Sequence, residues 1–184
     1  MGLACARFKS IMPNRQKSHR KSFTPKRSGK TGLPAGSLVH LGERKIEHAA
    51  IKLIEYDNDT IKETYFASLS ECRACAPTLP KFWLNVHGLH EPEVMQEIGK
   101  RFQLHPLVLE DILNTNQRPK VEDYGSYLFL VARLFNYDPD TLSIATEQVS
   151  FVIGQNYVLT FQECPSGNFD PIRAWLHSDK GRIR

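Results

Sequence analysis

The distribution of charge divides this chain into two unlike parts, and the division limits what can fold. Residues 1–31 contain nine Lys or Arg residues and no Asp or Glu. The whole chain of 184 residues has 24 basic and 20 acidic residues, so residues 32–184 carry a net charge of −5. Residues 1–31 also lack apolar periodicity and cannot bury enough surface to offset the entropy of ordering. We therefore expect a basic, disordered tail at 1–31 and one folded domain at 32–184.

The basic tail leaves several roles open. A solvated extension is the simplest interpretation, a polybasic segment that contacts anionic lipid or nucleic acid is the second, and an organellar presequence is the third. A secretory signal is excluded because the apolar stretch Gly2–Ala6 is far too short. The tail alone therefore does not indicate a function.

The body lacks the sequence patterns of a membrane span and of the common enzyme motifs. Its longest run without charge, residues 148–162, includes Gln, Gly and Asn residues. A spanning helix needs about 20 mainly apolar residues. No Gly-x-Gly-x-x-Gly, Walker-type or Gly-x-Ser-x-Gly motif is present. We expect a soluble chain that is not an enzyme and does not itself conduct ions.

The four cysteines suggest a metal or redox site only weakly. Cys72 and Cys75 form a Cys-x-x-Cys motif, which is typical of zinc sites and thioredoxin-like redox sites. No second ligand pair follows, and no buried strand precedes the motif. The favoured interpretation is two incidental cysteines on a helix.

The order of apolar patterns predicts the fold class. Gly and Pro residues at 32–36 indicate where the folded domain begins. Alternating or continuous apolar runs predict strands at 37–41, 49–56, 61–67, 82–86, 127–137, 146–153 and 157–161. Helical spacing and Pro residues at first turns predict helices at 69–75, 91–103 and 105–113, and from 170 onward. Strands, then helices, then an antiparallel meander indicate an α/β layer fold.

Two adjacent acids on the predicted helix 105–113 are the best candidates for chemistry. Glu110 and Asp111 are about 100° apart around a helix, so they cannot both face the core. One interpretation is a solvated pair or a salt bridge to Arg118 or Lys120, which residue chemistry alone favours because exposed acids are common. The other is a carboxylate site for a hard divalent cation such as Mg²⁺.

The stretch from His105 to Glu122 resembles the signature of the N-terminal cytoplasmic domain of the CorA family of magnesium and cobalt transport proteins. Further resemblances occur in the same order at 32–39, 82–89, 147–153, 159–163 and 169–173. The resemblance spans residues 32–184 and none of the basic tail. A nearly continuous match of this length is far more specific than a spaced three-residue motif.

The resemblance implies an α/β/α layered domain with a mainly antiparallel, mixed sheet between helical layers. In the family, this domain lies on the cytoplasmic side of the inner membrane and forms the funnel of a homopentamer above a pore. Divalent cations, Mg²⁺ and also Co²⁺, bind between neighbouring domains and favour closure. By this match, Asp111 and Glu110 occupy regulatory metal positions, and their partner carboxylates lie on the long helix that follows the domain.

The sequence ends at Arg184, before that long helix, the transmembrane helices and the Gly-Met-Asn pore motif of the family. We therefore expect weak Mg²⁺ binding, a monomer or weak oligomer, and membrane contact only through the missing part or the tail. The rival hypothesis is a nucleic-acid-binding protein that uses residues 1–31. It is less favoured, and no nucleic-acid partner is expected, because the body shows no basic stripe.

Overall fold

The computed structural model describes residues 32, 34, 36–42, 44–66, 71 and 77–178. Within these ranges, seven strands form one sheet in the order β2-β1-β3-β7-β6-β5-β4. The strands are β1 (Ala50–Tyr56), β2 (Ile61–Phe66), β3 (Lys81–His87), β4 (Lys120–Asp123), β5 (Leu128–Asp138), β6 (Ser143–Ile153) and β7 (Tyr157–Gln162). The helices are α2 (Pro92–Arg101), α3 (Pro106–Leu113) and α4 (Asp170–His177).

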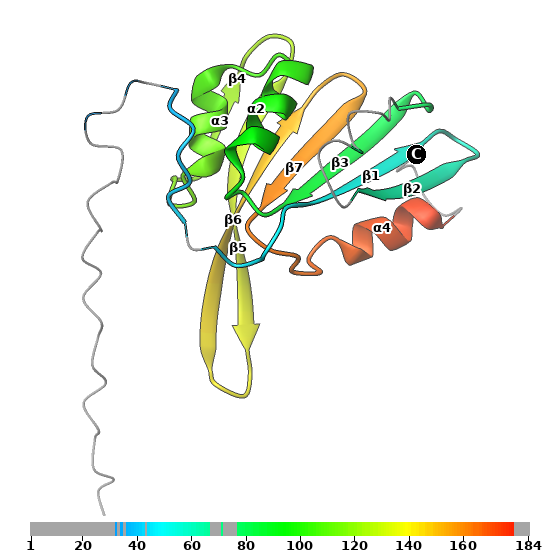
Figure 1. Cartoon of the computed structure of the whole chain (residues 1–184). Coiled ribbons are helices and arrows are strands. Elements are labelled where there is room, and N and C mark those ends of the chain that lie inside the picture. The colour runs from blue at the N-terminus through cyan, green and yellow to red at the C-terminus, as the bar shows by residue number, and fades with distance from the viewer. Residues whose placement is uncertain are drawn as a thin grey trace, which may run out of the picture.

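The sheet is mixed and mainly antiparallel. Only β3 and β7 pair in parallel, and the other five neighbouring pairs are antiparallel. Helices α2 and α3 cover one face of the sheet, and α4 lies against the other (Figure 1). These layers confirm the predicted α/β/α fold class.

Two apolar clusters, one on each face, hold the layers together. The larger cluster packs Met95 of α2 and Ile112 of α3, both fully buried, against central strand residues such as Phe129. The smaller cluster packs Leu176 of α4 near Trp83, whose ring meets that of Phe169 edge-on at 5.5 Å. Burial of large apolar side chains on both faces is the main stabilising contribution to such a fold.

Strand β1 is buried more completely than its alternating sequence predicts. Residues 51–55 are all buried, including Lys52 and Glu55, because α2 and α4 cover opposite faces of the central strands. Lys52 forms an ion pair with Glu63 of β2. Glu55 accepts hydrogen bonds from the backbone N–H groups of Thr78 and Leu79. The charged residues that alternate with apolar ones in β1 are therefore buried and paired, and they do not form a side that faces solvent.

Three local segments differ from the prediction or cannot be compared with it. Residues 37–41 form no strand: Leu41 N–H donates to the carbonyl of Leu113 at the end of α3 (3.0 Å), and the segment pairs with none of the strands in the described ranges. The sequence did not predict strand β4, because only one of its four residues, Val121, is apolar. A short, charged strand of this kind is typical of a sheet edge. The predicted helix 69–75 lies, except for Glu71, outside the described residues.

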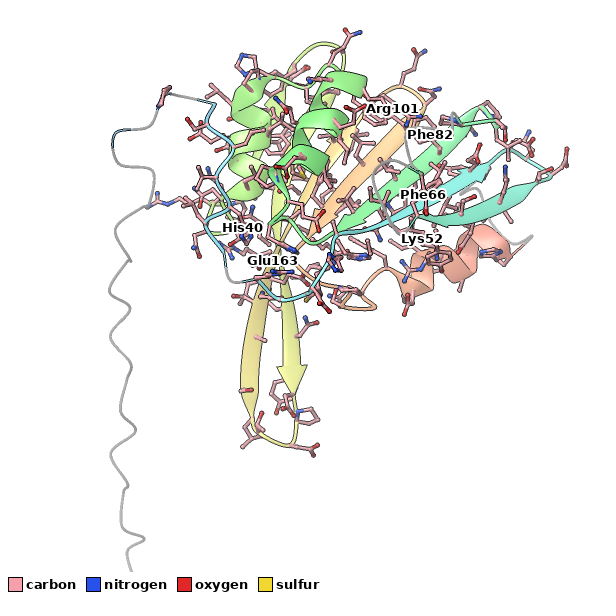
Figure 2. The ribbon with its side chains drawn as sticks, viewed as in Figure 1. His40, Lys52, Phe66, Phe82, Arg101 and Glu163 are labelled. Atoms are coloured by element: carbon pink, nitrogen blue, oxygen red, sulfur yellow. The ribbon has the colours of Figure 1, made fainter. Side chains whose placement is uncertain are left out.

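The segment before β1 is fastened to the body by close polar contacts. A Cβ on Gly42 would lie 2.8 Å from each of three atoms: His40 Nε2, Glu163 Oε1 and Thr115 Oγ1. Only glycine fits this approach without displacing them. Figure 2 shows His40 and Glu163 at this junction, and Lys45 pairs with the same glutamate at 2.8 Å. These contacts place the segment across the C-terminal end of α3, beside the predicted metal residues.

Candidate functional site

Helix α3 positions the two acids singled out by the sequence. His105 precedes it with extended backbone, and its Nδ1 accepts a hydrogen bond from Leu107 N–H (3.2 Å), as an N-cap does. Pro106 occupies the first turn, where its missing N–H costs little. The helix buries Val108, Leu109, Ile112 and Leu113. This burial fixes the rotation of α3 and leaves Glu110 and Asp111 half-buried at its edge.

Glu110 is directed at the segment that precedes β1. Its Oε2 accepts a hydrogen bond from Gly36 N–H at 2.6 Å. Gly36 has φ of +83°, and a Cβ there would lie 3.0 Å from the Cβ of Pro106. The contact therefore depends on glycine at this position, both for its backbone conformation and for the close approach.

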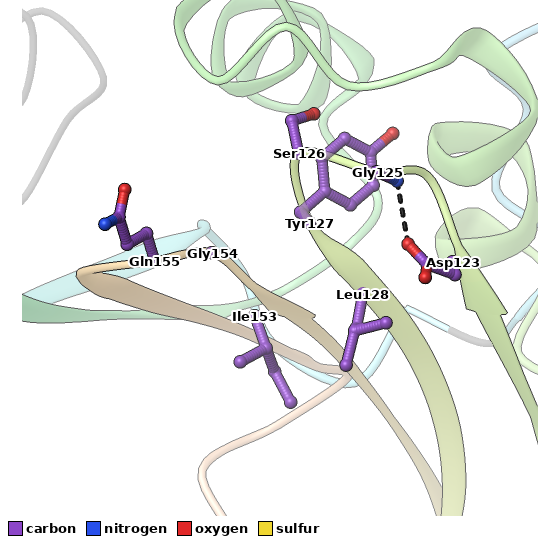
Figure 3. Close-up of a pocket in the computed structure, with 8 residues that line it drawn as sticks. All are labelled: Asp123, Gly125, Ser126, Tyr127, Leu128, Ile153, Gly154 and Gln155. Carbon is purple, nitrogen blue, oxygen red and sulfur yellow. Dashed lines mark hydrogen bonds between the residues drawn. The ribbon is translucent and has the colours of Figure 1, made fainter.

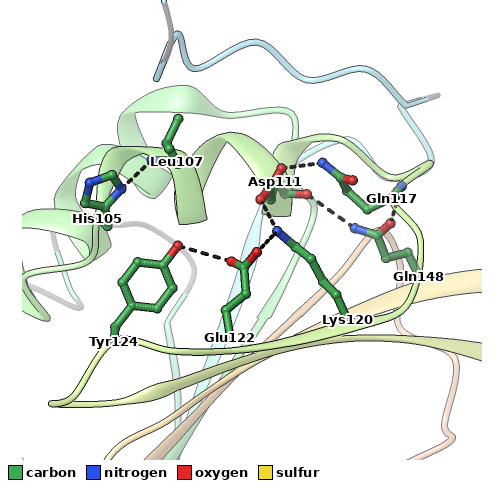
Figure 4. A network of polar contacts seen from close by, with 8 residues as sticks. All are labelled: His105, Leu107, Asp111, Gln117, Lys120, Glu122, Tyr124 and Gln148. Carbon is green, nitrogen blue, oxygen red and sulfur yellow. Dashed lines mark hydrogen bonds and ion pairs between the residues drawn. The ribbon is translucent and has the colours of Figure 1, made fainter.

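Asp111 is directed at the opposite side, toward β4 (Figure 4). Its Oδ2 lies 2.7 Å from Lys120 Nζ, and its Oδ1 accepts a hydrogen bond from the side-chain amide of Gln117. The Asp111 side chain is 19% exposed and that of Lys120 is 28% exposed. The salt bridge to Lys120, one of the two alternatives that the sequence left open, is therefore present in this chain.

Lys120 bridges two carboxylates. Its Nζ lies 2.8 Å from Glu122 Oε1, and Tyr124 O–H donates to the other oxygen of Glu122 (3.2 Å). Partial burial lowers the pKa of Lys120, but hydrogen bonds to Asp111 and Glu122 outweigh it, so the pKa lies above its ordinary value. The hydrogen bond from Lys120 lowers the pKa of Glu122. The ammonium group is thus held charged between two anions.

Two glutamines complete the network, and sequence reasoning missed both. Gln148 of β6 accepts from Gln117 N–H (3.0 Å) and donates to the carbonyl of Asp111 (3.4 Å). Arg133 of β5 donates to the carbonyl of Gln117 (3.0 Å). Gln148 is only 2% exposed. Buried polar side chains are hydrogen-bonded, so an amide within an otherwise apolar strand was the sequence feature that could have indicated this residue.

The network supplies hard oxygen ligands but not a complete metal shell in one copy. The contacts of Glu110 and Asp111 diverge, toward Gly36 and toward Lys120. Within the described ranges, no group of three or more His, Cys, Asp and Glu residues gathers closely enough to hold a metal ion. Carboxylates suit Mg²⁺, which takes one or two of them and keeps several waters. The donor chemistry therefore fits this cation, with Lys120 as its competitor for Asp111.

The other candidate sites, a cysteine pair and a cavity, have less support. Cys72 and Cys75 lie outside the described residues. A shallow cavity of about 600 Å³ opens between the β4–β5 and β6–β7 turns (Figure 3). Its only charged lining residue, Asp123, already accepts a hydrogen bond from Gly125 N–H at 2.7 Å. The α3–β4 network therefore remains the best candidate site.

Comparison with known families and proteins places this geometry in context. Residues 82–182, more than half of the chain, match the family described as CorA-like Mg²⁺ transporter protein. The cobalt/magnesium transport protein CorA of Thermotoga maritima is 38% identical over 157 residues, which cover 85% of this chain and 44% of that protein. The magnesium transporter ALR2 of Saccharomyces cerevisiae is 35% identical over 94 residues, or 50% of this chain and 10% of that protein. The chain spans less than half the length of both relatives.

Solved structures agree on the fold. The full-length CmaX protein superposes with a TM-score of 0.53 and 17% identity, covering 76% of this chain and 42% of that one. The CorA magnesium transporter of Methanocaldococcus jannaschii gives 0.50 and 11%, covering 68% and 36%. None of the helices in the described ranges has the length and apolar content needed to cross a bilayer. The chain belongs to the CorA-like Mg²⁺ transporter family, a family of transporters and not of enzymes.

Proposed function

We propose that this chain is the cytoplasmic, divalent-cation-sensing domain of a CorA-like magnesium or cobalt transporter, and that it regulates ion flux without conducting ions. The observation that carries the proposal is the Asp111–Lys120 ion pair at the exposed edge of α3. A half-buried carboxylate that is neutralised by a side-chain cation can exchange that cation for a metal ion. Family membership supplies the transported class of ion.

The exchange begins with Lys120 bound to both Asp111 and Glu122. Lys120 can release Asp111 and keep its contact with Glu122, so its charge does not become unpaired. Asp111 then offers oxygens to Mg²⁺ or Co²⁺, and Gln117 holds the carboxylate in place. Glu110, on the adjoining side of α3, contributes to the negative potential. This route needs no rearrangement of the helix itself.

The proposal includes a homopentamer in which the neighbouring copy completes the metal shell. Affinity for a hard cation depends on the number of charged oxygens around it. In a single copy, Asp111 and Glu110 are directed apart, and Lys120 neutralises both Asp111 and the nearby Glu122. Mg²⁺ binding to the isolated chain is therefore weak, and the cation acts as a bridge between copies on the cytoplasmic side of the membrane.

A chimaeric transporter tests this function. The part of this chain aligned over 157 residues with the Thermotoga maritima protein replaces that part of the relative, and ion flux is measured as internal Mg²⁺ is varied. Asp111→Ala should leave the chimaera conducting at Mg²⁺ concentrations that close the parent chimaera, because one bridging ligand is lost.

The matched control is Asp59→Ala, in the exposed turn between β1 and β2, far in sequence from α3. The control should close at the same Mg²⁺ concentration as the parent chimaera. Equal Mg²⁺ sensitivity of flux in the Asp111 variant and the parent would contradict the proposal.

A further inference from the structure

The distal half of the β5–β6 hairpin extends past both helical layers (Figure 1). This part, residues 134–147 and here called the arm, pairs regularly from Leu134↔Glu147 to Asp138↔Ser143. Residues 135–138 and 143–146 are all exposed. A two-stranded ribbon without further support is marginal in water. Within the described part of the chain, no other element covers these exposed residues of the arm.

One face of the arm is apolar. Tyr137 pairs directly with Ile144, and Phe135 lies two residues before Tyr137, so the three side chains share a face. Phe135 is 71% exposed, Tyr137 61% and Ile144 64%. On the other face, the exposed part of the arm carries only small or polar side chains: Asn136, Asp138, Ser143 and Ala145. Leu134 and Glu147 lie on that face at the base of the arm, where Leu134 packs against the smaller core cluster and Glu147 is buried. We call the apolar row the stripe. Exposed apolar rows with polar margins are typical of interaction surfaces.

The tip of the arm adds an independent observation. Leu142 has φ of +51° and is 76% exposed. A left-handed backbone costs an L-residue with a Cβ about 1–2 kcal/mol. Glycine or asparagine would relieve this strain at a turn. The chain instead places a large apolar side chain there, and nothing in the described residues covers it.

We propose that the arms of two copies of this chain pack stripe against stripe, antiparallel, about a two-fold axis. Charge at the two ends of the stripe argues for a second copy. Arg133 lies on the stripe face, two residue pairs inside Phe135; it donates to the carbonyl of Gln117, and no carboxylate pairs with it in the described ranges. Asp140 is exposed at the tip, and no cation pairs with it in the same ranges. Antiparallel packing brings Asp140 of each copy beside Arg133 of the other.

The size of the contact sets its strength. Each exposed aromatic or aliphatic side chain of the stripe and tip can bury on the order of 100 Å². Four of them give roughly 400 Å² per copy, whereas stable complexes bury about 800 Å² per partner. The dimer is therefore weak and depends on protein concentration. It uses the same patch on both copies, and is thus separate from the metal-bridged ring proposed above.

Sedimentation velocity of the full chain at increasing concentration tests the contact. The parent chain should shift toward a dimer, and Phe135→Ser combined with Ile144→Ser should weaken the dimer by at least about tenfold. The matched control is Trp175→Ser on α4, which removes an equally exposed (64%) apolar side chain outside the arm and should change nothing. Circular dichroism checks that each variant is folded. A chain that stays monomeric throughout, or a dimer that survives the arm variant, would overturn the proposal.

A charge exchange and a crosslinking experiment identify what packs against the stripe. Arg133→Asp should weaken the dimer, and adding Asp140→Arg to the same chain should restore it, because the two charges meet across the axis. A photoreactive phenylalanine at position 135 should crosslink to residues of the arm of a second copy. Crosslinks to residues 1–31 would mean that the basic tail covers the stripe, and failure of the charge exchange would mean that the arms do not pair antiparallel; each result overturns the proposal.

Discussion

Buried charge in this molecule is held by specific partners, and Glu55 of β1 is the clearest case. It is 2% exposed and accepts hydrogen bonds from two backbone N–H groups and from the hydroxyl of Thr78 (3.0 Å). Burial alone would raise its pKa, but these hydrogen bonds and the nearby Lys62 lower the pKa below its ordinary value. The carboxylate therefore fastens the chain before β3 to the neighbouring strand β1.

Glu55→Ala should lower the free energy of unfolding by about 1–3 kcal/mol, because two backbone N–H groups and the Thr78 hydroxyl lose their acceptor. Urea denaturation measures the change. Glu55→Gln keeps one acceptor oxygen and should cost less than the alanine variant. Glu47→Ala, an exposed position before β1, serves as the control and should cost little. Equal losses for positions 47 and 55 would contradict this role.

Lys120→Met should tighten Mg²⁺ binding to the isolated chain by about tenfold, or about 1.4 kcal/mol. The substitution removes the ammonium group that neutralises Asp111 and lies 5.4 Å from the centre of the Phe129 ring, and it keeps an unbranched side chain of similar length. Titration calorimetry compares the variant with the parent chain and with Lys81→Met, an exposed control at the start of β3. Unchanged affinity in the Lys120 variant would mean that Lys120 and Mg²⁺ do not compete.

Two half-buried histidines, His40 and His87, predict how stability depends on pH. Burial lowers the pKa of His40 and of His87 below the ordinary value of 6.5, only partly opposed by Glu163 and Gln162 respectively. Among the described residues, the buried Nε2 of His40 has no hydrogen-bond partner, which fits a neutral ring. The unfolded chain therefore takes up protons on both rings at a higher pH than the folded chain does.

The free energy of unfolding should thus be fully retained above pH 6.5 and should decrease as the pH falls through 6.5 toward the lowered values. Urea midpoints across this range measure the slope. His40→Gln and His87→Gln should each make it shallower. His48→Gln, with a side chain 78% exposed, should leave it unchanged. A slope that only the His48 variant alters would contradict the assignment.

Among the elements, the β5–β6 hairpin shows how one segment serves two purposes. Its proximal half, with Phe129 and Val131 fully buried, belongs to the core. Its distal half carries an exposed stripe and a strained turn. This contrast within two continuous strands is what favours an interaction role for the arm.

Leu142→Asn should therefore stabilise the monomer by about 1 kcal/mol, because asparagine tolerates φ near +51°, and should weaken self-association. Gln103→Asn is a matched control, since Gln103 has φ of +52° in the turn between α2 and α3. It should give a similar gain in stability without changing association. Chemical denaturation and sedimentation separate the two effects. Equal effects of both variants on association would contradict the role of the arm.

For the whole molecule, the sequence predicted the layers of the fold better than the contacts around the candidate site. Helix 105–113 and the central strands follow from apolar spacing, because burial decides both. The partners of Asp111 depend on tertiary neighbours: Gln148 lies 37 residues away and β4 carries little apolar signal. Residues 37–41 resemble a strand in sequence because Leu38 packs against the apolar core, while the backbone of Leu41 hydrogen-bonds to the end of α3. Long-range contacts of this kind leave no local pattern.

The central claim, that Asp111 exchanges Lys120 for a divalent cation, is tested most directly by nuclear magnetic resonance. Mg²⁺ is titrated into the chain, and the side-chain carboxylate carbon shifts of its aspartates are followed. We predict a saturable shift at Asp111, accompanied by a change at the Lys120 side chain, while the exposed Asp59 shows only a small, linear drift. An Asp111 signal that moves no more than that of Asp59 would contradict the claim.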